Sequence, residues 1–240
     1  MSLSPEKRSS LRVHLLGRPS VDGQHGCYRV RSRKSWALLA YLVLSDRPPT
    51  RSHLAGLLFG DANDPLGALR WGLSEVRRAL RGIVTLDGDP VILRRHPDLV
   101  FDVDIVARGP WTSAVHLPAF GAELLEGMTL SGVPVFDSWL LAEQRRLASA
   151  STAALQAAIA EEEMRGDYRA AIRYAVQRLS IEPLDEDSHA QLIRLYRLVG
   201  DHDAAKRQYS ACQRLLHTEL GTVPGPSLLI ALETSAARVA

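Results

Sequence analysis

Residues 64–81 read DPLGALRWGLSEVRRALR, and this stretch decides the fold of the amino-terminal half of the chain. Asp64 followed by Pro65 is a strong helix start, because aspartate accepts hydrogen bonds from free backbone amides and proline suits the first helical position. Apolar residues then recur at spacings of three and four, at Leu66, Leu69, Leu73, Val76 and Leu80. This pattern predicts an amphipathic helix that runs to about Arg81 and ends at Gly82.

Two shorter helices are expected before this one. Residues 32–44 read SRKSWALLAYLVL, in which the apolar side chains have helical spacing, and Pro48 and Pro49 stop that helix. Thr50 is a capping residue type and predicts the start of a second helix, which ends at Gly60. Three helices therefore follow one another closely in this half of the chain.

Strand patterns flank the three helices on both sides. Residues 11–16, LRVHLL, predict a strand closed by Gly17 and Pro19, and a second extended run surrounds Tyr28. After the third helix, IVTL and VILRR flank the turn sequence DGDP of residues 87–90, which predicts a hairpin. The order of strands, three helices and a carboxy-terminal hairpin is typical of a winged helix-turn-helix of the response-regulator type.

The charge of the chain is divided unevenly. The net charge is +2, but residues 1–100 contain 16 Lys and Arg against 9 Asp and Glu, whereas residues 101–240 contain 13 against 18. A basic half is expected to meet a polyanion, here double-stranded DNA. In a helix-turn-helix the recognition helix enters the major groove, and the predicted third helix carries arginines away from its apolar stripe.

The candidate DNA contacts are mostly arginines, which bind phosphates or form two hydrogen bonds to guanine. They are Arg70, Trp71, Ser74, Arg77 and Arg78 on the third helix, Arg33 and Lys34 at the start of the first, Arg51 at the start of the second, and Arg94 and Arg95 on the hairpin. Arg70 lies on the second helical turn and is expected to read a base, whereas Arg77 and Arg78 are expected to hold phosphates. The alternatives are that the arginines only solvate the helix, that Trp71 caps the core, and that Arg70 pairs with Glu75 or with an acidic residue of the second domain.

From residue 137 onward the sequence predicts helices, and it contains an internal repeat. GDYRAA at residues 166–171 recurs as GDHDAA at residues 200–205, and this offset of 34 residues is the period of tetratricopeptide repeats. Helices are expected near 137–164, 168–181, 185–199, 201–219 and 226–239, with residues 101–135 as a connector. The predicted fold class is an α+β winged helix-turn-helix domain, residues 1–100, followed by an all-α tetratricopeptide-like helical repeat domain, residues 101–240.

Several function classes have no support in the sequence. No metal-ligand spacing, phosphate-binding glycine loop or cysteine pair occurs, and the eight histidines are scattered. No apolar stretch approaches the roughly 20 residues that cross a bilayer, and the first residues lack the apolar core of a signal peptide. We expect a cytoplasmic protein, nucleoid-associated when bound to DNA, with no enzymatic activity, cofactor, metal or membrane partner.

Except for the connector at residues 105–130, nearly the whole chain resembles the Streptomyces antibiotic regulatory protein family, in which a winged helix precedes a bacterial transcriptional activator domain. The matching segments are SRKSWALLAYLVL (32–44), RSHLAGLLF (51–59), ALRWGLSEVRRAL (68–80), FDSWLLAEQRRL (136–147), the two GD repeats and ELGTVPGPSL (219–228). One departure is Gly67, which stands where relatives often carry a polar, base-facing side chain.

The resemblance implies a transcriptional activator that binds promoter repeats through its winged helix. It also implies that the helical domain contacts RNA polymerase or a partner protomer, the latter giving a homodimer on DNA. Two alternatives stay open at this point: a helical-repeat adaptor for protein interactions, and the amino-terminal regulatory module of a larger multidomain regulator.

Overall fold

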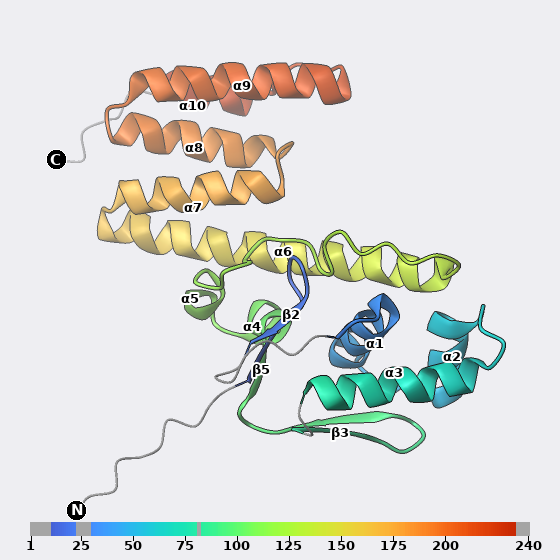
Figure 1. Cartoon of the computed structure of the whole chain (residues 1–240). Helices are drawn as coiled ribbons and strands as arrows, with labels where there is room; N and C mark the ends of the chain where they lie inside the picture. Colours follow the sequence, from blue (N-terminus) through green and yellow to red (C-terminus); the bar gives the residue numbers. More distant parts are fainter. Residues whose placement is uncertain (1–10, 23–29, 81–82, 234–240) are drawn as a thin grey trace, which may run out of the picture. The chain divides into compact units, whose positions relative to one another are not determined.

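The computed structural model describes residues 11–22, 30–80 and 83–233. They fall into two compact units (Figure 1). Unit 1 contains the chain up to residue 109 together with residues 117–147, and unit 2 contains residues 110–116 and the chain from residue 148. The assignment of separate roles to residues 1–100 and 101–240 stays a prediction.

Unit 1 begins with a three-stranded sheet. Its strands are β1 (Leu11–His14), β2 (Ser20–Asp22) and β5 (Leu99–Phe101), in which β1 pairs antiparallel with β2 and parallel with β5. The first strand is shorter than predicted, because the amides of Leu15 and Leu16 donate to the carboxylate of Asp102 rather than to a strand. The extended run predicted around Tyr28 lies outside the described residues.

Three helices follow, and each begins at a side-chain cap. They are α1 (Arg33–Leu44), α2 (Arg51–Phe59) and α3 (Pro65–Ala79). The caps Ser32, Thr50 and Asp64 each accept a hydrogen bond from the amide three residues further on, which satisfies a donor that the helix leaves free. The predicted starts at Thr50 and Asp64 are therefore confirmed. The helix α3 ends at Ala79, and residues 81 and 82, where its end was predicted, lie outside the described residues.

The apolar face of α3 forms the centre of the three-helix packing. Leu69, Leu73 and Val76 are fully buried, and a Cβ atom at Gly72 would lie 3.3 Å from side-chain atoms of α1 and α2. Glycine therefore lets these helices approach closely. The prediction that Leu66 joins this stripe is wrong: it is 50% exposed, because the buried face is centred on positions 69, 72 and 76 and turns residue 66 toward its edge.

The rest of unit 1 supports the three helices. The predicted hairpin is confirmed: β3 (Val84–Asp87) pairs antiparallel with β4 (Ile92–Arg95). The helix α4 (Asp102–Arg108) follows β5, and α6 (Pro134–Arg165) contributes its residues 134–147 to this unit. Near the start of α6, the ring of Trp139 lies 4.7 Å from that of Tyr41 on α1, centroid to centroid.

Unit 2 is helical and is built in layers, as Figure 1 shows. It contains the short α5 (Trp111–Ala114), residues 148–165 of α6, α7 (Tyr168–Ile181), α8 (Glu186–Leu198), α9 (His202–Leu220) and α10 (Pro226–Glu233). Gly166 and Gly200 precede α7 and α9 with φ of 75° and 81°, a conformation that glycine adopts without strain. Ala171 and Ala205 are buried in two successive core clusters. The predicted helical repeat is therefore present.

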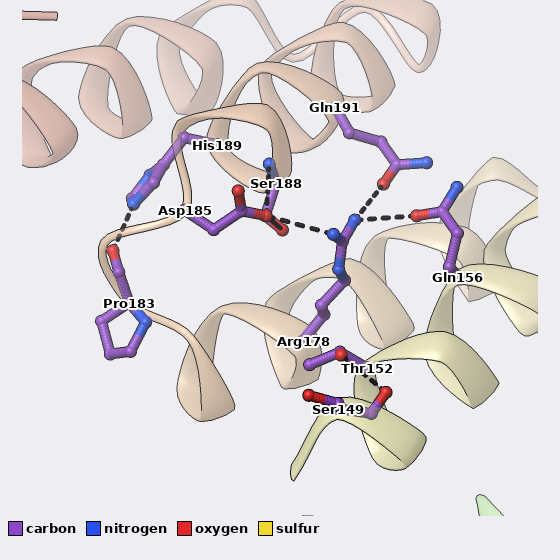
Figure 2. A network of polar contacts seen from close by, with 9 residues as sticks. All are labelled: Ser149, Thr152, Gln156, Arg178, Pro183, Asp185, Ser188, His189 and Gln191. Atoms are coloured by element: carbon purple, nitrogen blue, oxygen red, sulfur yellow. Dashed lines mark hydrogen bonds and ion pairs between the residues drawn. The ribbon is translucent and has the colours of Figure 1, made fainter. Parts of the chain in front are cut away.

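A polar network joins the helices of the first repeat (Figure 2). The guanidinium of Arg178 on α7 donates to the amide oxygens of Gln156 on α6 and Gln191 on α8, at 2.8 and 3.4 Å. It also pairs with Asp185, the capping residue of α8, at 3.1 Å. One arginine thus connects three helices and helps to fix their mutual position.

Candidate nucleic-acid interface

The helix α3 presents one polar face to solvent. Trp71, Ser74 and Arg78 are exposed, and their spacings of three and four residues place them in one row with Gly67. Arg70 is exposed beside this row. Trp71 is 54% exposed, so more than half of its surface is open to a ligand, and whether the rest of the residue caps the core stays a prediction.

Arg70 is held by the residue that begins its own helix. Its Nη2 lies 3.5 Å from Oδ2 of Asp64, while Oδ1 of the same carboxylate accepts the amide of Gly67 at 2.8 Å. A Cβ atom at position 67 would overlap Oδ2 of Asp64. Glycine at this position therefore leaves the space in which the capping carboxylate reaches Arg70.

Glu75 does not pair with Arg70, although that was one of the sequence-based alternatives. Its side chain is buried, and Oε1 accepts the amides of Arg31 and Ser32 at 2.8 and 3.4 Å. These amides lie just before α1, where a helix start leaves donors free. Glu75 thus connects the start of α1 to α3. Arg70 pairs with Asp64 instead, which belongs to the same unit.

Arg77 and Arg78 are neighbours in sequence, but the structure uses them differently. Arg77 is half-buried, and its Nη2 donates to the carbonyl oxygen of Leu86 on β3 at 3.1 Å. Arg78 is exposed, and its side chain makes no hydrogen bond or ion pair within the described part of the chain. Arg77 therefore fixes the hairpin to α3, whereas Arg78 leaves its charge available.

The two candidates at the start of α1 have partners within unit 1. Arg33 donates to the carbonyl oxygen of Thr129 at 3.3 Å. Lys34 pairs with Asp61 at 2.5 Å, and its ammonium lies 5.6 Å from the centre of the Phe59 ring. The hydrogen bond from Lys34 lowers the pKa of Asp61 below its ordinary value. Both pairs include exposed groups, which a phosphate can displace at modest cost.

The candidates on α2 and the hairpin also differ in whether their charge is used for contacts within unit 1. The amide and Nε of Arg51 donate to the hairpin turn, at Asp89 and Gly88. Arg95 pairs with Asp104, donates to the carbonyl oxygen of Val43 and stacks on the Phe101 ring at 4.7 Å. Arg94 is exposed, and its side chain makes no hydrogen bond or ion pair among the described residues. Among the hairpin arginines, Arg94 is thus the one open to a ligand.

Sequence reasoning missed the roles of two acidic residues in this arrangement. Asp64 was predicted as a helix cap, but its contact with Arg70 depends on the glycine at position 67. An aspartate cap followed three residues later by a glycine is a local signal that could have indicated this contact. Glu75 carries no such local signal, because its partners lie 43 and 44 residues away. Within the described ranges, no cluster of three metal-ligating side chains occurs and no helix could cross a membrane.

Comparison with known proteins adds the family. Residues 103–233 match the model of the bacterial transcriptional activator domain. The structure of Mycobacterium tuberculosis EmbR in complex with a low-affinity phosphopeptide is similar in fold, with a TM-score of 0.63 and 22% sequence identity. That likeness covers 94% of this chain, which spans 65% of the EmbR chain. No curated protein matches this chain.

The fold predicted from sequence is confirmed by this likeness, since EmbR shows the same winged helix followed by helical repeats. The matched family is one of transcriptional regulators. The domain match covers more than half of the chain, so the protein belongs to the bacterial transcriptional activator domain family, as its resemblance to the Streptomyces antibiotic regulatory proteins implied.

Proposed function

We propose that the protein activates transcription by binding promoter DNA through the exposed face of α3. The observation that carries this proposal is that Arg70, Trp71, Ser74 and Arg78 lie exposed on the helix whose other face fills the core of the unit. A helix supported in this way can enter the major groove with its base-reading side chains already on the outside.

The side chains on this face are assigned different roles. Arg70 reads a base edge, a guanine in the simplest case, because it lies on the second turn of α3 and is oriented by Asp64. Trp71 offers an apolar surface to a thymine methyl group or a sugar. Arg78, further along the helix, and Arg94 on the hairpin hold phosphates, since both are exposed cations.

Three of the predicted contact residues act by positioning the hairpin. Arg77, Arg51 and Arg95 use their guanidinium groups for hydrogen bonds within unit 1. Bound in this way, they fix the hairpin to α3, to the start of α2 and to the end of α1. We therefore assign them an indirect role in DNA binding, through the position of Arg94 and of the hairpin backbone.

The helical repeats serve as the activating surface in this proposal, where they contact RNA polymerase or the second protomer of a dimer on repeated DNA sites. Support comes from the stacked layers of unit 2, in which α7, α8 and α9 follow one another in the stack. Stacked helical repeats form extended binding surfaces in many proteins.

The test uses the full chain and a duplex selected by the protein from random sequences, with a scrambled duplex as the control. Binding is measured by fluorescence anisotropy over a series of salt concentrations. For about five to eight phosphate contacts we expect a log–log slope of about −4 to −7. A folded protein that selects no duplex and shows no salt-dependent binding would contradict the proposal and favour a helical-repeat adaptor.

A further inference from the structure

A groove of about 600 Å³ lies along α9 in unit 2, far in sequence from the proposed DNA-binding face. One wall includes Tyr196, near the end of α8, and the rest comes from α9. Three cations line it, at Lys206, Arg207 and Arg214, and its lining contains no carboxylate. The groove therefore presents positive charge around a partly apolar floor.

These cations differ from others in the same unit. Arg165, Arg178 and Arg194 each pair with a carboxylate. Lys206, Arg207 and Arg214 are exposed, and their side chains make no hydrogen bond or ion pair with other described residues. They also lie in the half of the chain that carries an excess of acidic residues. The positive groove is thus a local feature rather than a consequence of composition.

The groove also contains the side-chain amide of Gln208, whose orientation is fixed by His189. Nε2 of His189 lies 2.8 Å from the carbonyl oxygen of Pro183, a contact drawn in Figure 2. Because a carbonyl oxygen only accepts, Nε2 carries the proton and Nδ1 is an acceptor. The amide nitrogen of Gln208 donates to this Nδ1 at 2.6 Å. Gln208 lines the groove, and its side-chain oxygen makes no hydrogen bond within the described part of the chain.

Tyr196 gives the groove a fixed apolar wall. Its half-buried side chain packs against both core clusters of unit 2, the one around Ala171 and the one around Ala205. Ala204 and Ala211 add small side chains beside it, which leave room for a ligand. Cations, an oriented acceptor and an apolar wall are thus combined in one groove.

We propose that this groove binds an acidic segment of a partner protein. A peptide supplies carboxylates for the three cations, apolar groups for Tyr196 and a backbone N–H for the oxygen of Gln208. A DNA backbone also supplies negative charge, but its phosphates donate no hydrogen bond to Gln208, so the groove fits a peptide better. The inference rests on the proposed function, because it names the chemistry of the partner that the activating surface contacts.

The probe is a fluorescein-labelled peptide of glutamate, leucine and tyrosine, and its binding to the full chain is followed by anisotropy. The test variant combines Arg207→Glu and Arg214→Glu. The matched control combines Arg169→Glu and Arg173→Glu, which change the same charge at exposed positions of α7. We expect about a tenfold or larger loss of peptide affinity in the test variant, equivalent to about 1.4 kcal/mol, and a change below about threefold in the control.

A second variant separates the effect of the Gln208 oxygen on peptide binding from the effect of the positive charges. Gln208→Leu removes the acceptor and keeps the cations, so peptide affinity is expected to fall while its salt dependence stays that of the wild type. The charge-reversal variant, by contrast, is expected to lose salt dependence as well as affinity. Circular dichroism establishes that each variant is folded before its binding is compared.

Two outcomes would overturn the inference. Equal losses in the test and control variants would show general attraction rather than a groove, and a loss of duplex binding without a loss of peptide binding would assign the groove to DNA. The selected duplex is titrated in parallel to keep the two proposals apart. If the wild type binds no duplex, the proposed function fails whatever the peptide does. If duplex binding is intact and peptide affinity is unchanged in the variant that combines Arg207→Glu and Arg214→Glu, only the groove assignment fails.

Discussion

Arg77 of α3 donates a hydrogen bond to the carbonyl oxygen of Leu86 on β3, with its Nη2 3.1 Å from that oxygen. The next residue, Arg78, is exposed. Two adjacent arginines of the same helix therefore have different functions: the first holds the hairpin in place and the second is available to a phosphate.

Arg77 and Arg78 provide a matched comparison of stability and DNA binding. Arg77→Ala should lower the free energy of unfolding by about 1–3 kcal/mol, because a part-buried carbonyl loses a charged donor. Arg78→Ala should leave stability within about 0.5 kcal/mol, as for other exposed positions, and should reduce the salt slope of DNA binding by about one unit. Urea unfolding and salt-dependent anisotropy measure the two effects. Equal stability losses in both variants would refute the assignment.

The starts of the helices in unit 1 could be predicted because each depends on neighbouring residues. Thr50 and Asp64 accept amides only three residues away, so the sequence contains both partners within one helical turn. Asp102 and Glu75 accept amides from residues far along the chain, at separations of up to 87 and 44. Such contacts leave no local pattern, because they depend on how the strands and helices pack.

The same distinction applies to the candidate site: features that depend on local geometry could be predicted, and features that depend on packing could not. Periodicity identified which face of α3 is polar, since that depends on helical geometry alone. It could not separate Arg77 from Arg78, or Arg95 from Arg94, because the hairpin and α4 select which arginine is used internally. The contribution of Gly67 was missed although the side chain through which it acts, that of Asp64, lies only three residues away in the sequence.

The contact between Asp64 and Arg70 predicts an effect on specificity. Asp64→Ser keeps a good helix cap, so stability should change little, but Arg70 loses its oriented partner. The preference for the selected over the scrambled duplex should fall by about 0.2–1 kcal/mol, the usual range for an exposed ion pair. Binding to the scrambled duplex should become stronger, because a negative charge is removed from the proposed DNA-binding face.

Arg70→Ala provides the control for this effect. By itself it should cost about 1–3 kcal/mol on the selected duplex and relax the preference at one base pair. In the Arg70→Ala background, Asp64→Ser should have no further effect on the preference, since the side chain that it orients is gone. A further loss of preference in the double variant would show that Asp64 acts independently of Arg70.

The repeat assignment predicts a tight crossing at Ala171. This residue is fully buried in a cluster with Ile159, Leu192 and Leu195. Ala171→Leu should therefore overpack the cluster and lower the free energy of unfolding by about 1–3 kcal/mol. Val176→Leu, at a half-exposed position of the same helix, is the control and should change stability by less than about 0.5 kcal/mol. Similar melting temperatures for the two variants would show that the crossing lies elsewhere.

Cys212 should be a poorly reactive thiol. It is buried in the second core cluster, and burial, helped by the charge of Glu186, raises its pKa to about 11. Because the thiolate is the reactive form, alkylation at neutral pH should be far slower in the folded protein than in the unfolded chain. A Cys27→Ser variant leaves Cys212 as the one cysteine, so mass spectrometry after iodoacetamide treatment follows it alone. Native labelling at the unfolded rate would contradict its burial.

Asp102 makes the stability of unit 1 dependent on pH. Its buried carboxylate accepts the amides of Leu15, Leu16 and Val103, and burial outweighs these bonds and raises its pKa above the ordinary value of 3.8. Between 3.8 and the raised value, the folded protein binds more protons than the unfolded chain. The stability contributed by this group is therefore fully present below pH 3.8 and is lost as pH rises through the raised pKa.

Asp102→Asn removes this titration and keeps one oxygen for the backbone amides, so the free energy of unfolding of wild type minus variant should decrease from pH 3.5 toward about pH 7. Since His14 Nδ1 lies 3.6 Å from the Asp102 carboxylate, both proteins are compared in a His14→Gln background. Urea unfolding at several pH values gives the difference directly. A difference that grows with pH would mean that the three amides, rather than burial, control the carboxylate, and that its pKa is lowered in the folded protein.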